Sequence, residues 1–107
     1  MPGPDKKNPD LRRKEDTLVK ERVNVPRRYK VLMHNDDFTP MEFVTQVLEE
    51  VFRRTPAEAT RIMLLVHRTG IGVAGVYSLE VAEAKAAQTM DRARANAYPL
   101  LVTTEPE

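Results

Sequence analysis

The apolar spacing of the chain changes abruptly between residues 29 and 52, and this change constrains the fold more than any other feature. Residues 29–33 are a short, largely apolar run, which predicts a strand over 29–34. After a polar stretch, apolar pairs recur at helical spacing, which predicts a helix over 40–53. These pairs are Phe43 with Val44, Val47 with Leu48, and Val51 with Phe52. A strand and a helix joined by a short loop are therefore the first unit of the fold.

The start of this helix has a recognisable capping pattern. Thr39 is expected to be the N-cap, Pro40 suits the first helical position, and Glu42 would complete a capping box. The polar residues 35–37 then lie on a tight loop at the strand end. Asn and Asp favour turns because they bond their own backbone, so a plain turn is one interpretation. Polar groups on a loop fixed by a rigid scaffold also suit recognition, which is the other.

A second helix begins almost at once, because residues 55–58 repeat the Thr-Pro-x-Glu pattern. It is expected to run from 56 to His67, with Gly70 as its C-terminal stop. His67 either ends the helix near its negative pole or points toward the 35–37 loop. With so short a connection, the two helices should form a hairpin.

The remaining chain predicts a strand over 71–77, a helix over 79–96 and a strand over 100–104. Gly72 and Gly75 suggest a bulge or a close backbone approach in the first of these, and Ser78 can cap the helix. Its expected apolar face is weak: Leu79, Val81, Ala82, Ala86, Met90 and Ala93. The order β-α-α-β-α-β predicts an α+β two-layer sandwich, in which three helices cover one face of a three-stranded antiparallel sheet.

Composition and charge divide the chain into two parts. Residues 1–26 hold four of the eight prolines and many charges without apolar periodicity, which predicts a flexible, disordered extension before a domain over 27–107. Residues 1–28 carry nine Lys or Arg and five Asp or Glu, whereas the remainder carries eight and eleven. The basic segment alternates its signs and lacks aromatic residues for base stacking, which argues against nucleic acid as a partner.

Several function classes find no support in the sequence. The chain has no cysteine, which excludes disulfides and thiol chemistry and suits a reducing cytosol. No apolar run approaches the roughly 20 residues of a membrane span, and no signal peptide is evident, so we expect no membrane association and a cytoplasmic location. Gly-x-Ser-x-Gly and phosphate-binding glycine loops are both missing. A metal site is conceivable, but its candidate ligands match no known spacing: His34, Asp36, Asp37 and His67.

Four motifs in register closely resemble the ClpS family. They are Asn35 to Val44 (NDDFTPMEFV), Ala59 to His67 (ATRIMLLVH), Gly75 to Lys85 (GVY with EVAExK), and Pro99-Leu100. ClpS proteins are adaptors of the AAA+ protease ClpAP, and in some lineages of ClpCP, that deliver proteins beginning with a bulky hydrophobic residue. The resemblance covers about residues 27–107 and implies that this chain is such an adaptor, without catalytic residues, metal or other cofactor.

The resemblance implies two sets of site residues. The first binds the N-terminal residue of a substrate, with Asn35, Asp36 and His67 holding its α-amine. The walls of the apolar pocket would be Thr39, Met41, Val44, Met63, Val66 and Leu100. The second set, Glu80, Lys85 and also Glu83, would dock on the N-terminal domain of the unfoldase, ClpA or ClpC.

The expected substrates are proteins that begin with Leu, Phe, Tyr or Trp, and the expected state is a monomer. The extension over 1–26 would be offered to the unfoldase pore. Phe38 departs from the Tyr of many relatives. Two other classes stay open on the residues alone: a small metal-dependent hydrolase using His34, Asp36, Asp37 and His67, and an interaction domain like the C-terminal domain of the ribosomal stalk protein.

Overall fold

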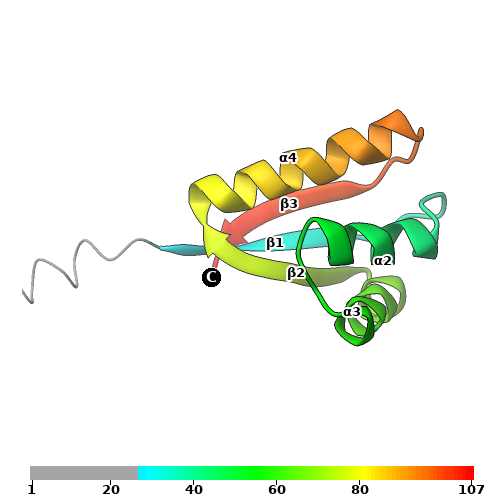
Figure 1. The fold of residues 1–107 in the computed structure, drawn as a ribbon, viewed down its shortest axis with the longest axis horizontal. Helices are drawn as coiled ribbons and strands as arrows, with labels where there is room; N and C mark the ends of the chain where they lie inside the picture. Colours follow the sequence, from blue (N-terminus) through cyan, green and yellow to red (C-terminus); the bar gives the residue numbers. More distant parts are fainter. Residues whose placement is uncertain (1–26) are drawn as a thin grey trace, which may run out of the picture.

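The computed structural model describes residues 27–107, and the predicted flexible extension over 1–26 lies outside the described residues. The element order is the predicted one, with boundaries that differ by a few residues (Figure 1). The elements are β1 (Arg28–His34), α2 (Met41–Glu50), α3 (Pro56–Thr69), β2 (Ile71–Ser78), α4 (Leu79–Ala95) and β3 (Leu101–Pro106).

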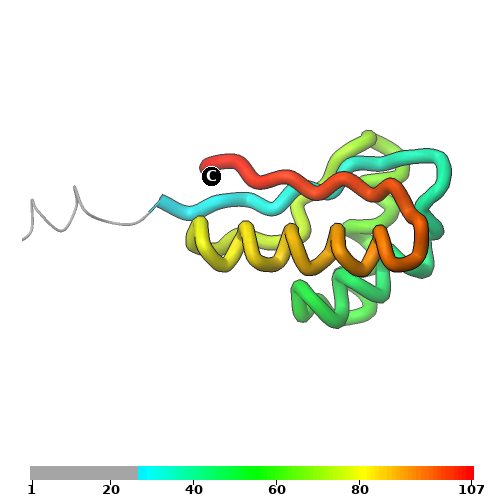
Figure 2. The backbone as a smooth tube through the Cα atoms, turned by 90° about the horizontal axis from the view of Figure 1, so that it is seen from above, coloured from blue at the N-terminus to red at the C-terminus, as the bar shows by residue number. Residues whose placement is uncertain are grey.

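The sheet has the order β2-β1-β3, and both pairs are antiparallel, so the predicted fold class is confirmed. The central strand β1 contributes Val31 and Met33 to the apolar core. Glu107 N donates to Arg28 O at 2.8 Å, so the C-terminus lies beside the start of β1 (Figure 2). This places the free end of β1 and the chain end together, at the end of the sheet away from the β1–α2 loop.

Strand β2 contains a bulge, and its glycines lie at close contacts, as predicted. The register of β1 with β2 shifts between Val31 and Leu32, which pair with Gly75 and Val73 and leave Ala74 as the extra residue of a bulge. A Cβ on Gly75 would lie 2.3 Å from the hydroxyl oxygen of Tyr77, so a side chain at position 75 would displace that ring.

The helices pack on the sheet in two groups. Helix α4 contacts all three strands, whereas α3 contacts β2 and α2 packs against α3 as a hairpin (Figure 1). Apolar residues of all six elements form one core: Val31, Met33, Phe43, Val44, Val47, Leu48, Val51, Phe52, Ala59, Ile62, Val66, Ala74, Ala82, Ala86, Ala93, Leu100 and Val102.

The buried face of α4 differs from the prediction. Leu79 and Val81 were expected in the apolar face, but they are 40% and 42% exposed. The buried positions are Ala82, Ala86, Thr89 and Ala93. These four follow one helical stripe, whereas positions 79 and 81 lie off it. The small alanines let α4 approach the sheet closely. The prediction of Leu79 and Val81 in the apolar face was wrong, because both are exposed.

Helix α2 is shorter than predicted. It ends at Glu50 rather than at 53, because Arg53 adopts a left-handed conformation with φ of 57°. Arg54 N then donates to Leu48 O at 3.0 Å, which satisfies a carbonyl at the helix end. Val51 and Phe52 stay buried in the turn that follows, so they keep their predicted place in the core.

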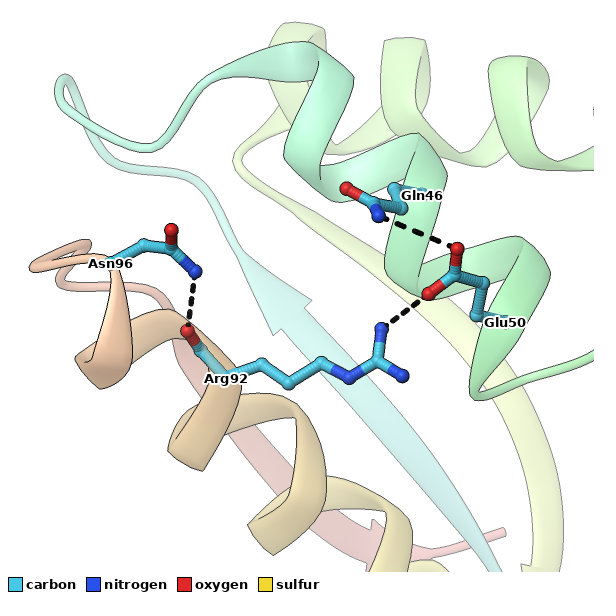
Figure 3. A network of polar contacts seen from close by, with 4 residues as sticks. All are labelled: Gln46, Glu50, Arg92 and Asn96. Atoms are coloured by element: carbon cyan, nitrogen blue, oxygen red, sulfur yellow. Dashed lines mark hydrogen bonds and ion pairs between the residues drawn. The ribbon is translucent and has the colours of Figure 1, made fainter.

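Polar side chains join α2 to α4 across the surface (Figure 3). Arg92 Nη1 donates to Glu50 Oε1 at 2.6 Å, and Gln46 Nε2 donates to the other oxygen at 3.4 Å. The hydrogen bond from Arg92 is the largest of the effects that lower the pKa of Glu50. Asn96 Nδ2 donates to Arg92 O at 2.9 Å and so satisfies a carbonyl at the end of α4.

No helix within residues 27–107 is long and apolar enough to cross a membrane.

Candidate functional site

A cavity of about 360 Å³ opens between the β1–α2 loop, the first turn of α2 and the second half of α3. It is lined by Asn35, Asp36, Asp37, Phe38, Thr39, Pro40, Met41, Val44, Met63, Val66 and His67. Every predicted residue of the substrate pocket is in this set except Leu100. Leu100 is buried in the core cluster that also contains Val44 and Val66. The fold thus brings together residues up to 32 positions apart around one opening, because Asn35 directly follows β1 and His67 lies in the last turn of α3.

The loop is organised by one carboxylate. Asp36 Oδ1 accepts hydrogen bonds from the backbone N–H groups of Phe38 and Thr39 at 2.8 and 2.7 Å. Asp36 Oδ2 accepts a third from the Thr39 hydroxyl at 2.7 Å. Burial raises the pKa of Asp36, but the hydrogen bonds from Thr39 and Phe38 together lower it below the ordinary 3.8. The carboxylate is therefore charged at neutral pH and holds the loop in one shape.

The predicted capping box of α2 is wrong. The N-cap of α2 is Pro40, which makes no side-chain capping bond, and the Thr39 hydroxyl donates to Asp36 rather than accepting from the helix. Asp36 competes for Thr39 because hydrogen bonds to an ionised carboxylate are stronger than those between neutral groups. The result is that Thr39 belongs to the pocket loop and not to the helix.

The opposite side of the cavity is fixed by the end of α3. Gly70 has φ of 93° and ends the helix as predicted, with its N–H donating to Val66 O at 2.9 Å. Gly70 O accepts from Asn35 N at 2.9 Å, so the loop and the last turn of α3 are hydrogen-bonded to each other. This bond holds Asn35 and His67 on neighbouring backbone segments.

The apolar wall consists of side chains from α2 and α3. Val44 and Val66 are buried, Met63 is half-buried, and Met41 at the opening is 40% exposed. A Cβ on Gly72 would lie 2.6 Å from Val66 Cγ2, so a side chain at position 72 would push this wall into the cavity. The predicted close backbone approach is therefore found at Gly72, and its effect is to place Val66.

The polar rim retains acceptors that the fold does not use. Within residues 27–107, the side chains of Asn35 and His67 make no hydrogen bond, and both residues are exposed. Asp36 Oδ2 accepts one bond and keeps a second lone pair. An amide oxygen, a carboxylate oxygen and an imidazole nitrogen at one opening suit a cationic donor with several N–H bonds.

His34 does not belong to this cavity. Its Nε2 lies 2.8 Å from Thr103 Oγ1 on the neighbouring strand β3. Among residues 27–107, no three His, Cys, Asp or Glu side chains lie close enough together to hold a metal ion. The metal-dependent hydrolase is therefore not supported by the arrangement of its proposed ligands.

The predicted docking residues lie on α4, away from the cavity. Glu80 and Glu83 are exposed on its first turns, next to the exposed Leu79 and Val81. Lys85 is half-buried: its Nζ donates to Val51 O at 2.7 Å and lies 5.3 Å from the centre of the Tyr77 ring. Lys85 thus ties α4 to the end of α2.

Sequence reasoning missed three residues that line the cavity in addition to the predicted ones: Asp37, Phe38 and Pro40. Their presence in the same short loop as Asn35 and Asp36 was the available signal. A larger cavity of about 530 Å³ lies between α2 and the end of α4 and contains none of the predicted site residues. Two of its polar side chains, Gln46 and Arg92, are hydrogen-bonded to Glu50.

The family model of the ATP-dependent Clp protease adaptor protein ClpS matches residues 24–103. The chain belongs to the ClpS family. It is 56% identical to the Clp protease adapter ClpS of Nitratidesulfovibrio vulgaris (strain Miyazaki F), over 91% of this chain and 97% of that protein. It is 53% identical to the ClpS of Caulobacter vibrioides (strain NA1000), over 85% of this chain and 84% of that protein.

A solved structure of a ClpS protein has the same fold. It is Agrobacterium tumefaciens ClpS2 bound to L-phenylalaninamide, with a TM-score of 0.74 and 45% sequence identity, covering 77% of this chain and 99% of that chain. The chain is therefore an adaptor of the Clp protease, and the ribosomal-stalk-like alternative is not supported. L-Phenylalaninamide has a free α-amine and a bulky side chain, as does the first residue of a protein that starts with Phe.

Proposed function

We propose that the cavity between the β1–α2 loop and α3 binds the first residue of N-degron substrates, and that the chain delivers these substrates to a Clp unfoldase. One observation carries this proposal. Hydrogen-bond acceptors at the rim, on Asn35, Asp36 and His67, adjoin an apolar wall in a single cavity. A protonated α-amine is a triple donor, so it matches this rim, and an apolar side chain matches the wall.

The energies indicate that both parts of the cavity are needed. Burying a Leu or Phe side chain contributes roughly 1.5–3 kcal/mol. Micromolar binding corresponds to about 8 kcal/mol, so contacts with the amine must supply much of the rest. An internal residue of a protein has no free amine and is therefore rejected.

Met41 sets the width of the opening. It lines the cavity and is exposed there, so its flexible side chain would narrow the entrance. A β-branched Ile or Val would meet this side chain close to its own backbone, whereas Leu, Phe, Tyr and Trp branch further out. We therefore expect these four residues as the accepted N-termini.

The remaining parts of the proposal concern delivery. Glu80 and Glu83 would contact the N-terminal domain of ClpA or ClpC, with Lys85 keeping α4 in place beside them. Residues 1–26 would be the segment offered to the unfoldase pore. The chain would act as a cytoplasmic monomer that binds and tethers without catalysing a reaction, using neither nucleic acid nor membrane.

Fluorescence anisotropy tests the pocket directly. The probe is a labelled peptide that starts with Leu or Phe, compared with the same peptide N-acetylated and with one that starts with Ile. The proposal expects binding of the free-amine Leu or Phe peptide, none of the acetylated peptide and weaker binding of the Ile peptide. Equal binding of the free and acetylated peptides would contradict the proposed role of the amine.

The two histidines provide a matched pair of variants. His67→Ala should weaken peptide binding about tenfold or more without unfolding the domain, because it removes one partner of a charged amine. His34→Ala is the control, since His34 contacts Thr103 and not the cavity. Equal affinity in His67→Ala and the parent chain would contradict the proposed role of His67.

Deleting residues 1–26 separates recognition from delivery. Peptide affinity should be unchanged, whereas degradation of a substrate by the complete Clp protease should slow. Loss of peptide binding in the truncated chain would mean that the extension is part of the pocket.

A further inference from the structure

Phe38 is the most exposed large hydrophobic residue in the part of the chain that the structure describes, with 77% of its surface open to solvent. The other two phenylalanines, Phe43 and Phe52, are both buried in the core. Phe38 also lines the substrate cavity, and Met41 is the only other exposed large hydrophobic residue among the lining residues of the described region. A solvent-exposed aromatic ring beside a ligand cavity can pack against the part of a ligand that extends out of the cavity.

The backbone on both sides of Phe38 is held by hydrogen bonds. Phe38 N donates to Asp36 Oδ1 at 2.8 Å, and Thr39 on its other side donates to the same carboxylate through both its N–H and its hydroxyl. The residue is therefore fixed on both sides. A ring that is presented by a fixed loop can contact a ligand at a small cost in ordering entropy.

The proposed function places the second residue of a substrate close to this ring. The first residue has its amine at Asn35, Asp36 and His67 and its side chain inside the cavity. The next Cα lies 3.8 Å further along the chain. The second side chain must then leave the cavity at its rim, where Phe38 and Met41 are exposed.

We infer that Phe38 forms a subsite for the second residue of the substrate and favours an apolar or aromatic side chain there. This inference rests on the proposed function and extends it from the first residue to the second. Contact between two aromatic rings corresponds to roughly a two- to tenfold gain in affinity. The subsite would therefore rank substrates that share the same first residue.

The test is a double-mutant cycle between protein and peptide. Two labelled peptides start with Leu-Phe and Leu-Gly and are otherwise identical. Their affinities are measured by anisotropy with the full chain, with Phe38→Ala and with Phe38→Tyr. Leu101→Ala is the matched control, because Leu101 is 51% exposed on β3 and does not line the cavity.

The expected result is a preference of about two- to tenfold for Leu-Phe in the parent chain, in Phe38→Tyr and in Leu101→Ala. Phe38→Ala should bind Leu-Phe and Leu-Gly equally, so the preference is lost whatever its affinity for Leu-Gly. A parent without preference, or an unchanged preference in Phe38→Ala, would overturn the subsite while leaving first-residue binding intact. Failure of the parent to bind either peptide would overturn the proposed function and the subsite together.

Discussion

The chain contains the pattern Thr-Pro-x-Glu twice, at residues 39–42 and 55–58, and uses it in two different ways. At α3 the pattern forms a complete capping box. Glu58 N donates to Thr55 Oγ1 at 3.2 Å, and Thr55 N donates to Glu58 Oε1 at 3.0 Å. At α2 the N-cap lies one residue later in the pattern, on Pro40 instead of Thr39, and it makes no side-chain capping bond.

The difference arises three residues before the first pattern. Asp36 precedes Thr39 and accepts from its N–H and its hydroxyl, whereas Phe52 occupies the matching position before Thr55. An apolar residue leaves the threonine free to cap its helix, while a carboxylate redirects it into the loop. The same four-residue pattern therefore forms a capping box at one site and part of the loop that lines the candidate cavity at the other.

The largest expected effect is that of Asp36→Ala. It removes three hydrogen bonds from the loop and one proposed partner of the amine. A hydrogen bond to a charged group contributes about 1.5–3 kcal/mol, which corresponds to a roughly 10- to 100-fold loss of peptide affinity. Anisotropy measures the affinity, and urea unfolding measures the accompanying loss of stability.

Asp37→Ala is the control for charge. Asp37 is exposed in the same loop, and its side chain makes no hydrogen bond within residues 27–107. The free energy of unfolding of Asp37→Ala should stay within about 0.5 kcal/mol of the parent's value. If both variants lost stability equally, Asp36 would not be the residue that organises the loop.

Removing each threonine tests the comparison directly. Thr55→Ala should lower the free energy of unfolding by about 1 kcal/mol through loss of the N-cap, with unchanged peptide affinity. Thr39→Ala should instead weaken peptide binding, because it loosens the carboxylate that holds the loop. Urea unfolding and anisotropy on both variants give the four values. The opposite outcome, with affinity lost in Thr55→Ala and kept in Thr39→Ala, would reverse the roles assigned here.

The elements and the site were predictable from the sequence to different extents. Apolar periodicity and the caps at Thr55, Gly70 and Ser78 predicted the order of the elements, because these signals are local. The start of α2 was not predictable from its own pattern, since the competing group lies outside it. The early end of α2 was also missed, because an arginine in the left-handed conformation, Arg53, carries no sequence signal.

The candidate site was predicted through resemblance and not through local chemistry. The loop residues alone left a plain turn as an alternative, and only the motif around His67 connected the loop with α3. Burial could not be predicted for single residues such as Leu100, which lies in the core, or Phe38, which is exposed at the cavity. Which side of an element faces the core depends on packing between distant segments.

Acid should weaken the loop at α2 through Asp36. The pKa of Asp36 is lower in the folded protein than the ordinary 3.8, so its contribution to stability is fully present above about pH 4 to 5 and is lost as the pH falls through the folded value. The stability difference between the parent chain and Asp36→Ala should therefore shrink as the pH falls from 7 to below 3.8. Urea unfolding at a series of pH values measures this difference in the free energy of unfolding. A difference that grew in acid would contradict a lowered pKa of Asp36.

The smallest expected effect separates the two glutamates of the repeated pattern. Glu42→Ala and Glu58→Ala each remove a negative charge from the first turn of a helix, so both lose the same favourable interaction with the helix dipole. Only Glu58 also accepts a hydrogen bond, from Thr55 N, and this bond is the largest effect on its lowered pKa. Glu58→Ala should therefore lower the melting temperature more than Glu42→Ala. Because the dipole term is common to both, the difference between the two reflects the capping box of α3 together with the weaker attraction of Glu58 to Arg54 and Arg61. Equal decreases would mean that the box contributes nothing.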